Sequence, residues 1–425
     1  MKTIVLDDDP TGTQSASGVT VLLECDADLL TEALTDADSV YVQTNSRALH
    51  EADAVALVMR IKAAGEEAAR RLGSPVRFVL RGDSTLRGHV FAESEAFLGP
   101  RGVLVFVPAF PGGGRTTRGG VHYVRIGDAE LPADQTEYAD DPVFGFSTGT
   151  LVDYVAEKSG RLGLPVSLED VRNGRLSQVL AAAPAGSVVL PDVVDDHDVR
   201  LIADAINASD ADLVIRSAAP LAAELARVAS TGLLPSPLID HALPTLLVCG
   251  SHTRGATAQL DAVTSRFGQA EVLDTEAALA DPRRAGLLVA GRATARLCDG
   301  PLAVIASQRL RSTEHGTLDH GERVMTALTT AVRELLPQVS VVVAKGGITS
   351  AEVARTGIGA TSAVVLGQIL PGVSVWRMRC HDDREFLYVV VPGNVGGPDT
   401  LVDVLAALRV APLVSARSGG APAGR

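Results

Sequence analysis

A chain of 425 residues is too long for one ordinary hydrophobic core, so two or occasionally three domains are expected. A net charge of −13 argues against non-specific binding to nucleic acid or to an anionic membrane, and no apolar run approaches the roughly 18 residues of a membrane-spanning helix. The amino terminus lacks the basic and apolar regions of a signal peptide, and the four cysteines are widely spaced. We therefore expect a cytoplasmic protein with reduced thiols.

In the first half of the chain, short β-branched runs alternate with segments of helical periodicity. Between the second and third runs, Leu57, Ile61, Ala64 and Ala68 recur on one face of a predicted helix. This alternation is typical of right-handed βαβ units and predicts a mainly parallel sheet. We predict its strands at residues 3–6, 40–43, 76–80, 103–107, 187–190 and 212–215.

The pattern breaks at residues 230–244, where three prolines interrupt it. We predict a linker there, between a first domain at 1–229 and a second domain at 245–412. The last segment, 413–425, is small, polar and rich in glycine, so we predict a disordered tail.

The second domain again alternates predicted strands and helices. The helices are expected near 256–267, 322–336 and 400–408, and the strands at 245–249, 287–290, 302–306, 341–345 and 386–391. The predicted fold class is therefore α/β, with two domains that each contain a mainly parallel sheet flanked by helices.

Three adjacent aspartates, Asp7, Asp8 and Asp9, follow the first predicted strand in the segment DDDPTGT at 7–13. Because ligands of an open parallel sheet bind at the carboxyl ends of its strands, this position favours a functional role. The carboxylates could bind substrate hydroxyls, act as a general base or hold magnesium, and Thr11 offers a hydroxyl. The alternative interpretation is a solvated turn with an Asx cap.

A second polar segment, RGDSTLRGH at 81–89, also follows a predicted strand directly. The guanidinium of Arg81 can bind a carboxylate through two hydrogen bonds, while Asp83 and Ser84 can hold hydroxyls. This one loop therefore offers a partner to both halves of a sugar acid. The alternative is a helix N-cap at Asp83 or Ser84, and we interpret His89 as a structural histidine.

The strand at 103–107 leads into a third segment, PAFPGGGRTT at 108–117. Its glycines let backbone amides approach an anion, and Arg115 adds a positive charge. Asn45, Ser46 and Arg47 follow the second strand and make a weaker contribution. Four consecutive strands that end in polar, anion-binding loops indicate a site more strongly than any one loop does.

The second domain has three glycine-containing turns between a predicted strand and a predicted helix. They are CGSHT at 249–253, KGGITS at 345–350 and PGNVGG at 392–397. Backbone amides at a helix amino terminus bind phosphate, so the three turns together favour a nucleotide site. The alternative is that each is an ordinary connection between a strand and a helix.

Several familiar signatures are missing from the sequence. It has no P-loop motif, no G-x-G-x-x-G after the first strand, no H-E-x-x-H and no paired C-x-x-C. P-loop kinases, dinucleotide dehydrogenases and zinc hydrolases are therefore disfavoured. The residues alone indicate an α/β enzyme that acts on a small anionic substrate.

Taken in order, these motifs resemble those of the four-carbon acid sugar kinase family, from Asp7 to Gly397. The chain departs from better-known members at Arg81-Gly82 and at Val391-Pro392, where those members have a Lys-Ser pair before the glycine. The motifs that carry the resemblance are Asp8-Asp9-x-Thr11-Gly12, Asp83-Ser84-Thr85, Gly250-Ser251 with Thr257 and Gln259, Gly346-Gly347-x-Thr349, and Gly393-Asn394-x-Gly396.

The resemblance implies a substrate-binding amino-terminal domain, an ATP-binding carboxyl-terminal domain and an active site in the cleft between them. Known members phosphorylate threonate, erythronate or 3-oxo-tetronate compounds, so the implied partners are a sugar acid and ATP, with Mg²⁺ as cofactor. A homodimer is one alternative for the oligomeric state, and metal ligands are left unassigned. We assign catalysis to Asp8 and Asp83, substrate binding to Asp9, Thr11, Arg81, Ser84 and Arg115, and nucleotide binding to Ser251, Gly346, Gly347, Ile348, Thr349 and Gly393.

Phosphoryl transfer depends mostly on positioning and charge neutralisation. We expect Mg²⁺ and the glycine-turn amides to neutralise a triphosphate, arginines to bind the substrate carboxylate, and Asp8 or Asp83 to accept the hydroxyl proton. Two other functions stay open. One is a metal-dependent lyase or aldolase that uses the aspartates, and the other is a non-catalytic sensor of sugar acid or nucleotide.

Overall fold

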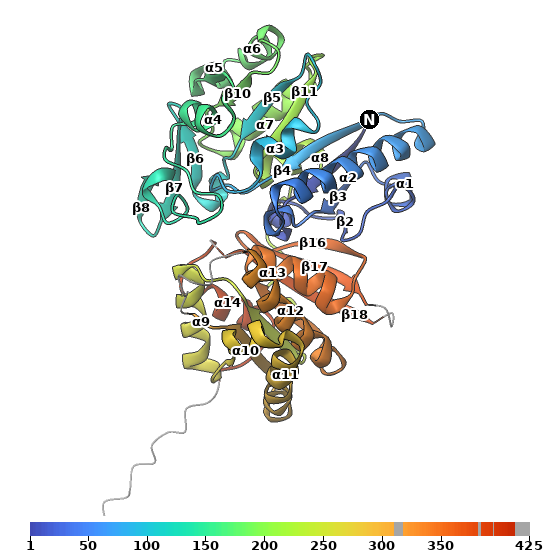
Figure 1. Cartoon of the computed structure of the whole chain (residues 1–425), viewed down its shortest axis with the longest axis vertical. Coiled ribbons are helices and arrows are strands. Elements are labelled where there is room, and N and C mark those ends of the chain that lie inside the picture. The colour runs from blue at the N-terminus through green and yellow to red at the C-terminus, as the bar shows by residue number, and fades with distance from the viewer. Residues whose placement is uncertain (310–317, 381–383, 394, 413–425) are drawn as a thin grey trace, which may run out of the picture.

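The computed structural model describes residues 1–309, 318–380, 384–393 and 395–412 of the chain. Two lobes follow one another along the sequence, coloured blue to green and yellow to red in Figure 1. Between helix α8 (Ala219–Ala226) and strand β12 (Thr245–Cys249) the chain forms only isolated β-bridges. The tail predicted at 413–425 lies outside the described residues, as does Asn394.

The amino-terminal half contains eight parallel strands in the order β2-β3-β1-β4-β11-β5-β10-β9. All six strands predicted for this half are present. The strands are β1 (Lys2–Asp7), β2 (Thr20–Leu22), β3 (Ser39–Gln43), β4 (Val76–Arg81), β5 (Val103–Val107), β9 (Gly163–Val166), β10 (Val188–Pro191) and β11 (Leu213–Ser217).

Helices cover both faces of this sheet because successive side chains of each strand point to opposite faces. In β1, Ile4 and Leu6 pack on one face with Leu30 of α1, whereas Val5 packs on the other face with Leu221 of α8. Besides α8, the helices of this half are α1 (Ala27–Thr35), α2 (Glu51–Leu72), α3 (Val90–Glu95), α4 (Leu151–Ser159), α5 (Leu168–Arg172), α6 (Leu176–Ala182) and α7 (Asp196–Asn207). A small antiparallel sheet is inserted after β5 and comprises β6 (Arg115–Arg118), β7 (Val121–Ile126) and β8 (Ala129–Pro132).

The carboxyl-terminal half has five parallel strands in the order β13-β14-β12-β15-β18, followed by the antiparallel strands β17 and β16. Besides β12, the strands are β13 (Glu271–Leu273), β14 (Leu302–Ser307), β15 (Val341–Lys345), β16 (Ser362–Leu370), β17 (Val373–Arg379) and β18 (Glu385–Val391). The helices are α9 (Arg254–Phe267), α10 (Thr275–Ala280), α11 (Pro282–Asp299), α12 (Leu318–Leu335), α13 (Gly347–Glu352) and α14 (Thr400–Ala407). The two-domain α/β class is confirmed.

The strand predicted at 287–290 is wrong, because these residues lie inside helix α11. Ala285, Val289 and Ala293 are buried at a spacing of four, whereas Leu287 and Leu288 are 42% and 56% exposed. The burial therefore follows the helical period. Four consecutive apolar residues do not by themselves distinguish a buried strand from a helix.

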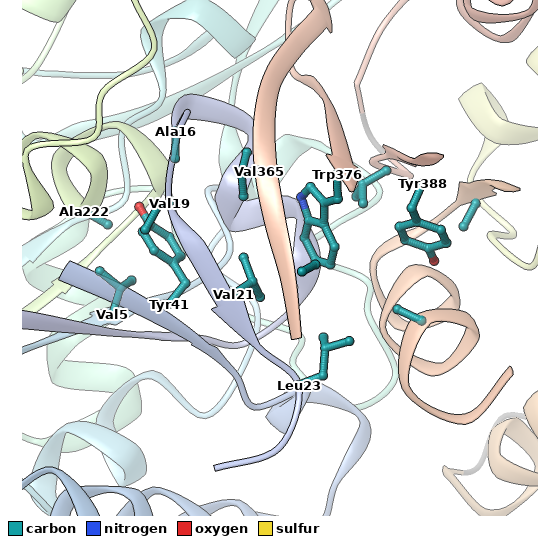
Figure 2. Close-up of a cluster of buried hydrophobic side chains, with 14 of the residues drawn as sticks. Val5, Ala16, Val19, Val21, Leu23, Tyr41, Ala222, Val365, Trp376 and Tyr388 are labelled. Atoms are coloured by element: carbon teal, nitrogen blue, oxygen red, sulfur yellow. The ribbon is translucent and has the colours of Figure 1, made fainter. Parts of the chain in front are cut away.

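The two sheets join edge to edge, which the sequence analysis does not anticipate. Strand β2 pairs antiparallel with β16, so that all fifteen strands form one continuous sheet. Figure 2 shows Val21 and Leu23, from the β2 segment, beside Val365 and Trp376 of β16 and β17. These side chains belong to one buried cluster that extends to Val5 and Tyr41 in the first half. The shared core holds the two halves against each other.

Candidate active site

Strand β1 ends at Asp7, the first of three consecutive aspartates that are all buried. The next residues form a short 3₁₀ helix, η1 (Pro10–Ser15), for which Asp9 is the N-cap: its Oδ1 accepts the backbone N–H of Thr11 at 2.8 Å. Gly12 packs so closely on the carboxylate of Asp7 that a Cβ would overlap it. Pro10 and Gly12 thus turn the chain back over the end of the sheet and keep Asp8 and Asp9 at its edge.

Arg81 counters the repulsion between the three carboxylates. It closes β4, in register with Asp7, and its Nη1 lies 3.0 Å from Asp7, 3.2 Å from Asp8 and 3.0 Å from Asp9. Its Nη2 donates to the hydroxyl of Thr11 at 3.0 Å. Burial lowers the pKa of Arg81, but the nearby aspartates more than offset this, and the guanidinium stays charged. In this arrangement Arg81 lies beneath the aspartate turn and orients it.

Asp7 lies deepest of the three aspartates and is fully buried. Burial raises its pKa to about 7, although Arg81 opposes the rise. Its Oδ2 accepts no hydrogen bond from the described residues. Asp7 is therefore partly protonated near neutral pH.

Arg47 is the second cation of the cluster and the one that joins its parts. Its Nε lies 3.2 Å from Asp8, its Nη1 lies 3.5 Å from Asp83, and its Nη2 forms an ion pair with Asp9. From its sequence, the loop after β3 was expected to contribute only weakly to the site. The position of Arg47 just beyond a strand end was the signal for a larger role.

Arg216 is a functional candidate that the sequence analysis missed. It lies in β11, beside β4, and its Nη2 lies 3.7 Å from Asp8 while its Nη1 forms an ion pair with Glu93. Gly82 makes room for it, because a Cβ there would lie 2.6 Å from Arg216 Nη2. Gly82 is therefore required for the packing of Arg216.

The loop at 83–89 holds Asp83 in an ionised state. Its Oδ2 accepts from Arg87 Nε at 2.8 Å and also from the hydroxyl of Thr85. Burial opposes ionisation, but Arg87 and Arg47 outweigh it and hold the pKa of Asp83 well below its usual range. Asp83 is not an N-cap of α3, whose N-cap residue is His89.

Two buried side chains hold the backbone of this loop. His122 Nε2 lies 2.8 Å from the carbonyl oxygen of Ser84, and Tyr154 donates its hydroxyl to the carbonyl oxygen of Leu86 at 2.8 Å. Leu86 has a φ of 67°, in the left-handed region that non-glycine residues rarely adopt. Burial lowers the pKa of His122 to about 4, so the imidazole is neutral at pH 7 and donates from Nε2. The loop conformation is therefore imposed by its tertiary contacts.

Arg115 lies at the start of β6, beside the ring of Tyr138. It is 3% exposed, donates to the carbonyl oxygen of Gly113 and forms a hydrogen bond with Tyr138. Arg87 lies over the same ring, with its guanidinium carbon 4.9 Å from the ring centre. Arg115 and Arg87 are thus neighbours on the Asp83 side of the cluster. His89, by contrast, contacts the carbonyl oxygen of Leu49 at 2.9 Å, as a structural histidine would.

The three glycine turns of the second half meet around Ser251. A Cβ on Gly393 would lie 2.7 Å from Ser251 Oγ, and a Cβ on Gly346 would lie 3.0 Å from Ser251 Cβ. Gly346 also has a φ of 113°, which favours glycine. Thr253 caps α9 and donates its hydroxyl to the carbonyl oxygen of Gly393 at 2.7 Å. The close approach of three backbones is the kind of surface that presents amides to phosphate.

The remaining nucleotide-binding candidates take different positions. Thr349 is 3% exposed, and its hydroxyl packs so tightly on Gly250 that a Cβ there would overlap it. Ile348 is 38% exposed on the first turn of α13. Val391, where the chain departs from better-known family members, is in register with Lys345 on the neighbouring strand.

The aspartate turn and a glycine turn contact each other directly. A Cβ on Gly347 would lie 2.7 Å from Asp9 Cγ and 3.3 Å from Arg47 Nη2. A few residues away, Asn45 donates its side-chain amide to Glu352 Oε1 at 2.9 Å. The aspartate turn and the glycine turn at Gly347, more than 300 positions apart in sequence, are therefore adjacent.

Among the described residues, no group of three or more histidine, cysteine, aspartate or glutamate side chains has the arrangement of a metal site. Among the described helices, none combines the length and apolar character that a bilayer crossing requires.

Family models match most of the chain. The model described as a sugar-binding N-terminal domain matches residues 3–225, and the one described as a nucleotide-binding C-terminal domain matches residues 246–401. Two structures have the same fold over 95% of this chain and 98% of their own: a Haemophilus influenzae protein (TM-score 0.60, 18% identity) and a Salmonella typhimurium LT2 protein (TM-score 0.66, 16% identity).

Three curated relatives have names that bear on chemistry. A D-threonate kinase of Bordetella bronchiseptica is 33% identical over 254 residues, which are 59% of this chain and 57% of the relative. A D-threonate kinase of Salmonella typhimurium is 31% identical over 290 residues (65% and 64%), and a D-erythronate kinase of Heliobacterium modesticaldum is 31% identical over 255 residues (58% and 55%). The chain thus aligns with about three fifths of the length of these relatives. The sugar-binding domain model matches more than half of the residues of this chain, and the nucleotide-binding domain model matches the part that follows. The chain therefore belongs to the four-carbon acid sugar kinase family.

Proposed function

We propose that this protein is an ATP-dependent kinase that phosphorylates a hydroxyl of a four-carbon sugar acid such as threonate, erythronate or 3-oxo-tetronate. The observation that carries the proposal is the contact between Gly347 and Asp9, which sets the glycine turns against the aspartate and arginine cluster. A donor phosphate on one side and an acceptor hydroxyl on the other would then be neighbours. The names of the relatives, D-threonate kinase and D-erythronate kinase, agree with this chemistry.

The acid would bind on the arginine-rich side of the cluster. Arg47, Arg87 and Arg115 surround Asp83, and an arginine fork matches the geometry of a carboxylate. Arg81 and Arg216 are each 1% exposed and directed at acidic side chains, so we assign them to orienting Asp8 and Asp9. Thr11 and Ser84, at the two turns, would offer hydrogen bonds to substrate hydroxyls.

The nucleotide would lie over the turns that meet at Ser251. Gly346 and Gly393 approach that serine closely enough to exclude any side chain, so that backbone amides can reach phosphate oxygens. The hydroxyl of Ser251 lies 3.4 Å from that of Thr253 and could also donate to a phosphate. Mg²⁺, which typically binds substrate phosphates with one or two carboxylates, would neutralise the triphosphate when bound, and Asp9, whose carboxylate contacts Gly347, is a candidate ligand.

Asp8 is the better candidate for the group that accepts the hydroxyl proton. Its Oδ2 accepts no hydrogen bond from the described residues, although Arg47 Nε lies 3.2 Å away. The carboxylate of Asp83 is occupied by Arg87 and Thr85. Asp8 Oδ2, which Arg47 and Arg216 approach without donating a hydrogen bond, can receive a proton as the hydroxyl attacks phosphorus, while Asp83 keeps the arginines in place.

The proposal is tested by measuring ADP release with a panel of four-carbon acids: the D and L forms of threonate and erythronate, and 3-oxo-tetronates. A kinase releases ADP in proportion to phosphorylated acid, with one or two preferred substrates. Consumption of an acid with magnesium but without nucleotide would instead support a lyase or aldolase. Binding of acid or nucleotide without turnover would support a sensor.

A further inference from the structure

Lys345 is a buried cation that the proposed chemistry has not used. The sequence contains four lysines, and Lys345 is fully buried at the end of β15, between Cys249 of β12 and Val391 of β18. The next two residues are Gly346 and Gly347. Its side chain therefore starts directly beneath the glycine turns.

Within the described part of the chain, Lys345 has one hydrogen-bond acceptor. Its Nζ donates to the carbonyl oxygen of Pro392 at 2.6 Å, in the turn that continues to Gly393. No aspartate or glutamate of the described residues lies within ion-pairing distance of Nζ. An ammonium group has three N–H donors, so two of them find no acceptor among the described residues.

The titratable groups around Lys345 do not compensate its charge. Cys249 faces it from β12, and burial raises the pKa of that thiol, so it is neutral. Arg309 lies beyond, with Nη1 3.6 Å from Cys249 Sγ and 2.6 Å from the carbonyl oxygen of Ser251. Burial lowers the pKa of Lys345 to about 7. A buried ammonium without a counter-ion is costly, so the neutral amine is favoured more than it is for a lysine in water.

We propose that the phosphate groups of the bound nucleotide are the missing counter-ion of Lys345, and that nucleotide binding is coupled to pH-dependent proton uptake by this side chain. The inference rests on the proposed function, in which the turns at Gly346 and Gly393 hold the nucleotide. An anion above those turns would favour the charged amine, which donates to Pro392 from one N–H and toward the phosphates from the others. Release of the nucleotide would return the proton to solvent.

The test is calorimetric titration of the protein with ADP and excess Mg²⁺, without sugar acid, in buffers that differ in ionisation enthalpy. With a pKa near 7 in the free protein and well above 8 in the complex, proton uptake should be about 0.1 at pH 6, about 0.5 at pH 7 and about 0.9 at pH 8. The Lys345→Met variant should bind ADP about tenfold or more weakly and lose this pH-dependent uptake. Lys62→Met is the matched control, because Lys62 also donates to a backbone carbonyl, that of Ala96, but lies in α2, away from the glycine turns.

The outcomes separate the two proposals. If wild-type protein binds ADP with the same small uptake at all three pH values, the role of Lys345 is overturned and the kinase proposal is unaffected. The same holds if Lys345→Met binds and takes up protons as wild type does. If ADP does not bind to the wild-type protein at all, both proposals fail. Should Lys345→Met not fold, the wild-type pH series alone decides between these results.

Discussion

The indole N–H of Trp376 donates to the hydroxyl of Thr13 across a distance of 2.9 Å. Thr13 belongs to η1, the turn that follows the aspartates, and its hydroxyl also lies 3.0 Å from that of Ser374 and 2.9 Å from the carbonyl oxygen of Pro10. Trp376 is buried in β17, beside Val365 and Tyr388 in Figure 2. The turn that carries Asp8 and Asp9 is therefore bonded to the carboxyl-terminal half of the chain.

Replacing Thr13 by valine should test this link. Valine keeps the shape of threonine but leaves the indole N–H of Trp376 without an acceptor, which costs about 1–3 kcal/mol for a buried donor. We expect a loss of that size in the free energy of unfolding. Trp376 is the only tryptophan, so its fluorescence during denaturation reports on the same site.

The double-mutant cycle with Trp376→Phe is the control. Phenylalanine removes the donor, so the Thr13→Val change should cost less in that background, and a coupling energy of about 1 kcal/mol is expected. Additive effects of the two substitutions would mean that the hydrogen bond contributes nothing to holding the halves together.

Gly347→Ala should separate the aspartate turn from the glycine turn. The added Cβ would lie 2.7 Å from Asp9 Cγ, so that either Asp9 and Arg47 or helix α13 must shift. We expect kcat/KM for phosphoryl transfer to fall at least tenfold, with a loss of stability of about 1–3 kcal/mol. Turnover and thermal unfolding measure the two effects.

Gly291→Ala provides the matched control for that substitution. Gly291 lies in α11 with open space around its Cα, and alanine is favoured over glycine in a helix by about 1 kcal/mol. This variant should be as active as wild type and slightly more stable. Full activity of Gly347→Ala would show that the contact with Asp9 does not matter for the reaction.

Asp83→Asn removes the carboxylate that holds Arg47 and Arg87. The amide keeps the size of the side chain but leaves two partly buried cations, Arg47 and Arg87, with less compensating charge, so the side chains on the acid-binding side should no longer be held in place. We expect turnover to fall about 100-fold or more while circular dichroism stays unchanged. Asp141→Asn is the comparison, since Asp141 lies 3.6 Å from Arg87 on its other side and should affect turnover less than threefold. Near-normal turnover of a folded Asp83→Asn protein would remove Asp83 from the active site.

Asp7 should make the protein less stable as the pH rises. Its pKa is about 7 in the folded state and ordinary, near 3.8, in the unfolded chain, so the folded state retains a proton that the unfolded chain releases. Its contribution to the free energy of unfolding is therefore fully present below pH 4 and decreases until about pH 7. The Asp7→Asn variant lacks this dependence. As the pH rises from 4 to 8, its free energy of unfolding should therefore increase relative to that of wild type by an amount on the order of a few kcal/mol.

Asp83 should give the free energy of unfolding a pH dependence of the opposite sign, which the Asp83→Asn variant removes. The pKa of Asp83 is held below its unfolded value, so its ionised carboxylate stabilises the fold above that value and the contribution is lost as the pH falls. Chemical denaturation of wild type and Asp7→Asn from pH 4 to pH 8 measures the slope of Asp7, whereas the series for Asp83→Asn has to extend below pH 3.8, because above that value the carboxylate is ionised in both states. Parallel curves for wild type and Asp7→Asn would show that Asp7 has an ordinary pKa.

Much of the fold and most of the turns around the site could be predicted because they depend on residues close together in sequence. Alternating apolar runs placed β1, β4, β5 and β15, and the polar segments that follow them, including Asp7–Asp9 and Gly346–Gly347, had to lie at the carboxyl edge of a parallel sheet. The same local reasoning failed at 287–290, where a four-residue apolar run is compatible with either a strand or a helix.

The remaining features of the fold and the site depend on long-range contacts. The pairing of β2 with β16 and the contact of Asp9 with Gly347 join residues some 340 positions apart, and no periodicity within either segment encodes its partner. The ion-pair partners of Arg47 and Arg81 and the lowered pKa of Lys345 could likewise not be predicted, because a charged side chain acquires its partners and its pKa from burial and from neighbours that only the folded chain brings together. The sequence by itself determined which residues carry charge and where each strand ends; the tertiary structure determined which charges face one another, since electrostatic interactions depend on distance in space.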